Sequence, residues 1–341
     1  MKGKTSRGFI GVLVVSAMGM PSASASPSAA LERLREVVAE VVDRAPGEIG
    51  VAIKHLESGQ QVEVRGHQAY PMASTFKLPI LVELFNQVDE GKIRLDEMVS
   101  LDVADLHLGS GQLKHYLVPG VSLSLENLAL LMMRISDNSA TDILLDRVGV
   151  DNVNRRLAAL GIEGISVNRS CQRLILNHLG LSEEVAQGKT YEEVVNWLDD
   201  YEPEPGELEK AAARFEDDPR DIATPLAMNR LLEKILQHQA AKPESCRKMI
   251  DIMLQCDTGK NRIRGFLSRD VEVAHKTGTI GGTVNNVGVI FLPAGRGRIV
   301  VSVLSKKMTD RDGAERAIAD VARYAYDYFL FTAPENAGGA R

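Results

Sequence analysis

The sequence predicts an α+β protein in which one antiparallel sheet is built from both ends of the chain and flanked by helices. Short apolar runs typical of strands occur near residues 50–65 and again within 271–305. Helix-like apolar patterns fill most of the chain between them. Because amphipathic elements must share a core, the economical arrangement is one sheet with flanking helices and a largely helical middle region.

The N-terminal half of this fold can be assigned segment by segment. Residues 28–44 have apolar side chains at helical spacing and predict an amphipathic helix. The runs GVAIKHL and QQVEVRG flank the turn ESG and predict a β-hairpin. A helical block is expected over about 74–160, with helix starts at Ser124 and Asp151.

The C-terminal part returns to strands. VEVAHKT, NNVGVIFL and RIVVSVLS are the expected strands, and a last helix is expected over about 311–330. The small and polar residues 336–341 are expected to be a disordered tail. Between the two strand regions, residues 181–220 are rich in Asp and Glu, and the turn EPEPG divides two helix-like runs. This stretch predicts an acidic helical insertion, either a lid or a solvated surface element.

Residues 1–25 predict a secretory signal peptide. A basic start, MKGKTSR, is followed by the apolar run GFIGVLVVSAMGM and by Ala23-Ser24-Ala25, which matches an A-x-A cleavage site. The apolar run has about 13 residues, too few to span a bilayer as a helix. We therefore expect a periplasmic or secreted protein that begins near Ser26 and makes no membrane contact after cleavage.

Composition excludes several classes of protein. Of 341 residues, 44% are hydrophobic and 25% charged, so the chain is neither disordered nor a polytopic membrane protein. The net charge of −6 and the lack of a basic patch argue against a nucleic-acid partner. The seven His residues are scattered without zinc-ligand spacing, so no metal or other cofactor is expected.

The three cysteines are expected to be free thiols. Cys246 and Cys256 fall on one predicted helical stretch, about 15 Å apart at the rise of an α-helix, which is too far for a disulfide. Cys171 has no local partner either. Packing is the expected role of all three.

Three short motifs carry the chemistry. Ser74 and Lys77 form S-x-x-K at a predicted helix start, where residues three apart share a face. A lysine with a depressed pKa can take the proton of a neighbouring serine. S-x-x-K alone is a weak signal, but Ser136 opens an S-D-N and Lys276 opens a K-T-G. All three in this order are characteristic of class A β-lactamases and penicillin-binding proteins.

The chain resembles a class A β-lactamase over most of its mature length. The segments that carry the resemblance are TFKLPI, SDNSATDILLDRVG, DIATPLAMNRLLEKIL, CDTGKNRIRGFL and VAHKTGTIGGTVNNVGVI. It implies a single β-lactamase/transpeptidase-like domain, residues 26–335, with the site between two subdomains. The expected α/β subdomain covers about 26–70 and 224–335, and the helical subdomain about 71–223, with the insertion at 181–220.

The resemblance also implies catalytic roles. Ser74 would open the lactam ring as the nucleophile, and Lys77 would be its base or proton relay. Ser136 would pass a proton to the departing nitrogen. The backbone N–H groups of Ser74 and Thr279 would form the oxyanion hole.

Substrate binding is implied for a second set of residues: Asn138, Lys276, Thr277, Gly278 and Arg262. Asn138 would contact the substrate amide, and Lys276 and Thr277 would hold the substrate carboxylate. Arg262 is a candidate second anchor, since a guanidinium matches a carboxylate bidentately. Structural roles are the better interpretation for three neighbouring residues, Asp137, His275 and Arg264.

One position departs from the family pattern. Class A enzymes carry Glu-x-x-Leu-Asn on a loop, and the Glu activates the water that hydrolyses the acyl-enzyme. Here Leu176-Asn177 matches, but the Glu position is Arg173, and no carboxylate occurs in 164–182. Losing a general base slows such a step roughly a hundred- to ten-thousandfold. Candidate substitutes are Glu183, Glu184, Glu192, Glu193 and His178.

Two functional hypotheses follow. The favoured one is a monomeric serine hydrolase that opens small-molecule β-lactams and deacylates slowly or through a substitute base. The alternative is a non-turnover β-lactam binder or sensor, or a D-Ala-D-Ala peptidase- or esterase-like relative. The complete motif set favours the first, and Arg173 favours the second.

Overall fold

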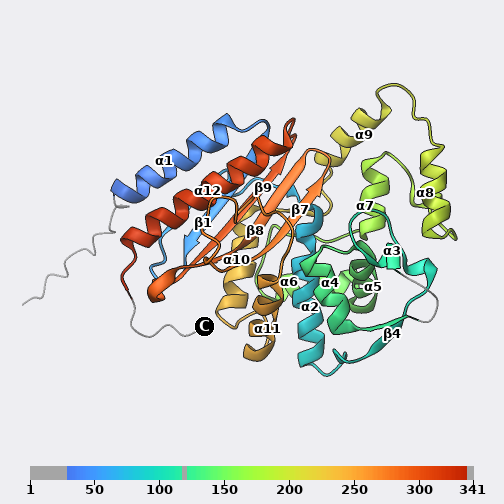
Figure 1. Ribbon diagram of the computed structural model, residues 1–341, viewed down its shortest axis with the longest axis horizontal. Helices are drawn as coiled ribbons and strands as arrows, with labels where there is room; N and C mark the ends of the chain where they lie inside the picture. Colours follow the sequence, from blue (N-terminus) through green and yellow to red (C-terminus); the bar gives the residue numbers. More distant parts are fainter. Residues whose placement is uncertain (1–28, 117–120, 336–341) are drawn as a thin grey trace, which may run out of the picture.

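The computed structural model describes residues 29–116 and 121–335, and its centre is a five-stranded antiparallel sheet (Figure 1). The predicted signal peptide and the predicted tail at 336–341 lie outside the described residues. The strands run in the order β2-β1-β9-β8-β7, so the two chain ends share one sheet, as predicted. They are β1 Glu48–His55, β2 Gln61–Val64, β7 Val273–Ile280, β8 Thr283–Phe291 and β9 Arg298–Lys306.

Helices cover both faces of this sheet. The terminal helices α1 (Ala29–Arg44) and α12 (Arg311–Thr332) lie side by side on one face (Figure 1). On the other face lie α10 (Pro225–Leu236) and, against β7, α11 (Pro243–Leu254). Strands β8 and β9 are buried almost throughout because both faces are covered, which accounts for their continuous apolar runs.

A helical region lies beyond α10 and α11. Its longer helices are α2 (Lys77–Asp89), α4 (Leu125–Arg134), α5 (Asn138–Val148), α6 (Val150–Ala159) and α7 (Cys171–His178). The acidic stretch forms the expected two helices, α8 (Tyr191–Asp199) and α9 (Glu207–Glu216), and they stand at the edge of the molecule (Figure 1). The division of residues 26–335 into two subdomains stays a prediction.

Several short elements complete the described chain. Two-stranded ladders pair β3 with β6 and β4 with β5. The strands concerned are β3 Tyr70–Pro71, β4 Met98–Ser100, β5 Ser122–Ser124 and β6 Ile222–Ala223. The short helices are α3 Leu113–Tyr116 and the 3₁₀ turns η1 Ala73–Phe76, η2 Val103–Asp105, η3 Glu183–Val185 and η4 Pro293–Gly295.

The structure corrects the expected helical block at 74–160. Within 98–116 and 121–124 the expected helical pattern is interrupted, because β4 and β5 pair there and Gly109 and Gly111 take positive φ angles that favour glycine. In these ranges only the short η2 and α3 are helical. The expected start at Ser124 is confirmed, since its side chain accepts the N–H of Asn127 and caps α4.

The cysteines are free and buried, as predicted. Their expected placement was partly wrong, because α11 ends at Leu254 and Cys256 lies beyond it in a turn. Thus Cys246 and Cys256 do not share a helix.

Three apolar clusters form the core. The largest packs α2, α4, α5, α10 and α11 against one face of the sheet, and the second packs α1 and α12 against the other. A small third cluster joins α7 to the acidic stretch 181–220. It consists of Leu108, Leu176, Ala186 and Val194. The motif residues lie where the helical region meets the β7 edge of the sheet.

Candidate active site

Ser74 lies on the 3₁₀ turn η1, which leads directly into α2. The preceding Ala73 has φ +44°, a conformation that is uncommon for alanine and recurs at functional sites. Strand β7 approaches this turn so closely at Gly278 that a β-carbon there would lie 3.1 Å from the backbone nitrogen of Ser74 and 2.6 Å from the Met72 oxygen. Glycine in the K-T-G motif therefore permits the contact between β7 and the serine turn.

Lys77 is fully buried and is the first residue of α2, about one turn after Ser74. Its Nζ donates to the Ser136 carbonyl oxygen at 2.7 Å, to Ser136 Oγ at 3.1 Å and to Asn138 Oδ1 at 2.8 Å. Ser110 supports the same loop, because its Oγ donates to the Ser136 carbonyl at 2.7 Å. Ser136 itself has φ +60°, so these bonds hold it in a strained conformation.

The Ser136 hydroxyl connects the two motif lysines. Besides Lys77, it accepts a hydrogen bond from Lys276 Nζ at 3.0 Å. Burial lowers the pKa of Lys77. Burial, followed by the charge of Lys77, lowers the pKa of Lys276 to about 7. A hydroxyl between two amines with lowered pKa values is well placed to relay a proton.

The side chain of Asp137 fixes the loop that carries Ser136 and Asn138. Its carboxylate accepts the N–H groups of Gln112 at 2.7 Å and Leu113 at 3.0 Å, and it caps α5 by accepting that of Ala140. The predicted structural role of Asp137 is confirmed. The amide of Asn138 is held between Lys77 and the Leu108 carbonyl, to which its Nδ2 donates at 2.7 Å.

The β7 edge brings the K-T-G residues together with Arg262. Thr279 is exposed on this edge, and its Oγ1 accepts a hydrogen bond from Arg262 Nη2 at 2.7 Å. Arg262 is buried, and its other N–H groups donate to Glu315 and to the carbonyl oxygens of Gly278 and Asn285. All five guanidinium N–H groups therefore already have protein acceptors.

The two other neighbours with predicted structural roles are placed as follows. His275 is buried in β7 and contacts the Asn286 amide through Nδ1. Arg264 is half-buried, and it donates to the Val273 carbonyl at 3.0 Å.

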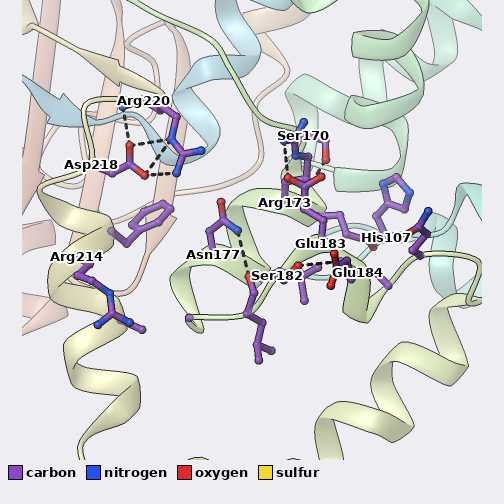
Figure 2. A pocket seen from close by; sticks show the side chains of 18 residues that line it. His107, Ser170, Arg173, Asn177, Ser182, Glu183, Glu184, Arg214, Asp218 and Arg220 are labelled. Carbon is purple, nitrogen blue, oxygen red and sulfur yellow. Dashed lines mark hydrogen bonds and ion pairs between the residues drawn. The ribbon is translucent and has the colours of Figure 1, made fainter.

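The loop with the missing glutamate differs from this network. Arg173 on α7 is exposed and forms an ion pair with Glu183 (Figure 2). Asn177 offers its Oδ1 to Arg169 and donates from Nδ2 to the Leu181 carbonyl. These residues line a cavity of about 1020 Å³ between α7 and α9. The side chains of Arg173 and Asn177 are thus committed to loop contacts.

The base of this loop is closed by a buried ion pair. Arg169 Nε donates to Asp221 Oδ2 at 2.6 Å, and both side chains are almost fully buried. Asp221 also accepts the backbone N–H groups of Asn168 and Arg169. This contact joins the two ends of a segment that contains α7, α8 and α9.

The candidate substitute bases lie in different surroundings. The four glutamates are exposed: Glu183 pairs with Arg173, Glu193 caps α8 through Thr190, and Glu184 and Glu192 also face solvent. His178 is half-buried, its ring packs edge-on against Phe215, and burial lowers its pKa. A β-carbon at Gly281, just beyond β7, would lie 2.3 Å from the His178 ring, so His178 contacts the β7–β8 turn.

Sequence reasoning missed several supporting residues. Ser110 lies between two glycines in GSG, which was the available signal. Asp142 accepts the N–H of Cys171 at 2.6 Å and so anchors α7 to α5, while Glu315 pairs with Arg262. Neither pairing has a sequence signal, because the partners are far apart along the chain. Cys171 proves to be close enough to Lys77 to influence its pKa.

The described residues contain neither a candidate membrane-spanning helix nor a candidate metal-binding cluster. Within 29–116 and 121–335 no helix is long and apolar enough to cross a bilayer. In the same ranges, no group of three or more His, Cys, Asp and Glu side chains is arranged to hold a metal ion.

The fold and the three assembled motifs define a β-lactamase-like protein. The Beta-lactamase enzyme family matches residues 33–329, so the chain belongs to that family, and it is a class A β-lactamase-like member. The family and the fold support β-lactam hydrolysis in general.

Individual relatives are distant but match nearly full length. Beta-lactamase VEB-1 of Pseudomonas aeruginosa is 26% identical over 313 residues, 89% of this chain and 92% of the relative. A β-lactamase structure from Sphaerobacter thermophilus is 29% identical, with a TM-score of 0.70, covering 88% of this chain and 98% of that one. A mutant of PBP-A, solved as an acyl-enzyme complex with penicillin G, is 27% identical, with a TM-score of 0.68, covering 88% and 97%.

Proposed function

We propose that the protein opens β-lactam rings through an acyl-enzyme on Ser74 and releases the product slowly. The observation that carries the proposal is the Ser136 hydroxyl, held between the buried amines of Lys77 and Lys276. The arrangement places a proton relay beside the turn that presents the serine.

The proposed acylation uses Ser74, Lys77 and Ser136 in turn. Ser74 Oγ attacks the lactam carbonyl carbon, and its proton passes to Lys77, whose lowered pKa makes the neutral amine accessible. The lactam C–N bond then breaks, and Ser136 gives the nitrogen a proton that Lys77 replaces. The backbone N–H groups of Ser74 and Thr279 stabilise the oxyanion, as such donors do in acyl transfer.

Substrate recognition falls to the β7 edge. Lys276 and Thr277 bind the substrate carboxylate, and Asn138 binds the side-chain amide. For Arg262 we propose a positioning role in place of direct anchoring, because its donors are occupied and it reaches the cleft only through Thr279. Gly278 contributes by allowing β7 to approach the serine turn.

Deacylation is the slow step in this proposal. Arg173 carries no acceptor for a water proton and is turned toward Glu183. Without a general base, we expect water attack to be roughly a hundred- to ten-thousandfold slower than with a positioned carboxylate. The acyl-enzyme therefore accumulates during turnover.

A second candidate is a β-lactam-binding or sensing protein that is acylated once and does not turn over. The same observation, Arg173 at the position of the general base, favours it. That a mutant of PBP-A, a distant structural relative, was solved as an acyl-enzyme with penicillin G makes this candidate concrete.

One experiment separates the two candidates. The mature protein is incubated with excess penicillin G, and intact mass and drug concentration are followed together, with Ser74→Ala as the matched control. A transient adduct with continued drug loss supports slow hydrolysis. A stable adduct with one equivalent of drug consumed supports the binder, whereas no adduct at Ser74 overturns both and leaves a peptidase- or esterase-like activity to test.

We further propose that the protein is exported by residues 1–25 and acts as a soluble monomer outside the cytoplasm. The absence of a spanning helix in the described residues is compatible with this. N-terminal sequencing of the protein from a periplasmic or culture fraction tests cleavage near Ser26, and light scattering tests the monomer. An uncleaved N-terminus or a cytoplasmic location would contradict the proposal.

A further inference from the structure

Next to Thr277 of the K-T-G strand lies a group of side chains that the proposed reaction does not use. Cys256 Sγ is 3.3 Å from Thr258 Oγ1, which is 2.6 Å from Thr277 Oγ1. A chain of two hydrogen bonds thus connects the thiol to the substrate-binding threonine. The segment is pressed on β7, since a β-carbon at Gly259 would lie 2.5 Å from Thr277 Cγ2.

His275 supplies a second, independent observation. Its Nδ1 accepts from the Asn286 amide at 3.1 Å, which assigns the ring proton to Nε2. This Nε2 is buried and has no hydrogen-bond partner among the described residues. The ring stabilises negative charge on Cys256: burial by itself raises the pKa of the thiol, but His275, Lys276 and Thr258 together lower it to about 6.

Cys256 is buried, with 6% of its surface exposed, but it lies beside a cavity. Cys256 forms part of the wall of a cavity of about 620 Å³. Four cationic residues line the same cavity, Arg134, Lys260, Arg264 and Arg269, against the single carboxylate of Asp257. Arg134 pairs with Asp257. Lys260 and Arg269 form no ion pair within the residues that the structure describes. The positive charge that lines the cavity therefore favours the binding of an anionic reagent.

We propose that Cys256 is a thiol–disulfide exchange site for small anionic disulfides, and that its modification slows acylation of Ser74. The Cys256 thiolate attacks one sulfur of the disulfide. The reagent's S–S bond breaks, a mixed disulfide forms on Cys256, and the other half leaves as a thiolate. The disulfide is the oxidant, so Cys256 is oxidised and the leaving half is reduced.

The geometry supplies the link to the active site. A mixed disulfide removes the thiol from its contact with Thr258 and removes negative charge that favours the ammonium form of Lys276. Thr277 and Lys276 are the two residues assigned to the substrate carboxylate. We expect the acylation rate at low drug concentration to fall about tenfold, the equivalent of one or two lost hydrogen bonds. The adduct is independent of the proposed function, whereas this effect rests on it.

The test follows modification and acylation separately. The purified protein is incubated with oxidised glutathione, and peptide mapping after intact-mass analysis identifies the modified cysteine. We expect one adduct, at Cys256, that dithiothreitol removes. Cys246→Ser is the matched control, because burial raises the pKa of that thiol, and it should react like the unmodified sequence. Cys256→Ser and Cys256→Ala should both give no adduct.

Disulfide reagents of opposite charge test whether the cavity favours anionic reagents. The cationic disulfide cystamine should react more slowly than oxidised glutathione, and Lys260→Gln with Arg269→Gln should narrow that difference. Equal rates for the two reagents would overturn the role of the cavity. Failure of the native protein to react at Cys256, while the unfolded protein reacts at all three thiols, would overturn the site itself.

Acylation by penicillin G is then compared before modification, after it and after dithiothreitol. A reversible loss of rate supports the link to Thr277 and Lys276, and an unchanged rate with a full adduct contradicts it. If neither form is acylated, the proposed function has failed, while the adduct still decides the exchange site.

Discussion

The acylation network and the loop around α7 lie next to each other but are built differently. Lys77 and Lys276 are fully buried and hydrogen-bonded to one serine hydroxyl. On the loop, Arg173 and Glu183 pair with each other at the surface and leave a large cavity beside them. In the proposed function, the first region holds the groups assigned to acylation, and the second has Arg173 at the position expected for the base of deacylation.

Under the proposed function, the two half-reactions therefore have separable structural requirements. Acylation depends on groups whose pKa values and positions are set by burial, so a single change there disturbs several contacts. The loop is held mainly at its base by the Arg169–Asp221 pair and tolerates exposed charged residues elsewhere. The following changes test this contrast, beginning with the largest effect.

Of the changes proposed here, Asp221→Asn should lower the free energy of unfolding most. The change leaves the buried Arg169 guanidinium with Asp218 as its one remaining carboxylate partner, and removing a partner from a buried ion pair costs up to about 3–5 kcal/mol. Asparagine accepts the positive φ of Asp221 (+53°), so the backbone itself is not the cause. Denaturant unfolding measures the loss.

Asp217→Asn is the control for this prediction. Asp217 pairs with Lys306 and Lys307 at the surface, where such pairs contribute about 0–1 kcal/mol. If the two variants lose equal stability, the buried pair is not what holds the loop.

Arg173→Glu should speed deacylation about a hundredfold, the lower range of a general base. Glu183→Gln accompanies it, because the new carboxylate would otherwise face Glu183. The lifetime of the acyl-enzyme, measured by intact mass after rapid mixing, should shorten while the acylation rate stays unchanged.

Arg173→Gln with Glu183→Gln removes the same ion pair without adding a base. This control should leave the lifetime unchanged. An equal shortening in both double variants would show that loop mobility, and not the missing carboxylate, limits deacylation.

The smallest predicted effect, per unit of pH, is the change in substrate binding as Lys276 loses its charge. The pKa of Lys276, ordinarily 10.5, is lowered to about 7, so its ammonium charge is present below pH 7 and is lost above it. Binding of a substrate carboxylate should therefore weaken as pH rises through 7, by about tenfold per unit once the amine is neutral. The dependence should appear in KM more than in kcat.

Lys276→Arg sharpens this prediction, because a guanidinium stays charged over the whole range. For this variant, KM should not change between pH 6 and pH 9, whatever the absolute rate of the reaction. A flat profile in the unaltered protein would contradict the lowered pKa.

Local sequence patterns predicted much of the fold and the motif residues. Alternation and apolar runs located the five strands of the main sheet, and caps such as Ser124 located helix starts. The pattern failed at residues 98–100 and 122–124, where two short strands are held by pairing with each other. Pairing of this kind depends on partners distant in the chain, so no local window contains it.

The sequence by itself determined which residues meet the chemical requirements, because a nucleophile, an amine and a carboxylate-binding strand need particular side chains in a particular order. It also determined that Arg173 cannot act as a base. Only the tertiary structure decided that one serine hydroxyl joins both lysines, that Arg262 has no free donor, and that Cys256 is connected to Thr277 through Thr258. These are consequences of burial and of long-range contact, which set pKa values and exhaust hydrogen-bond donors only when the chain is folded.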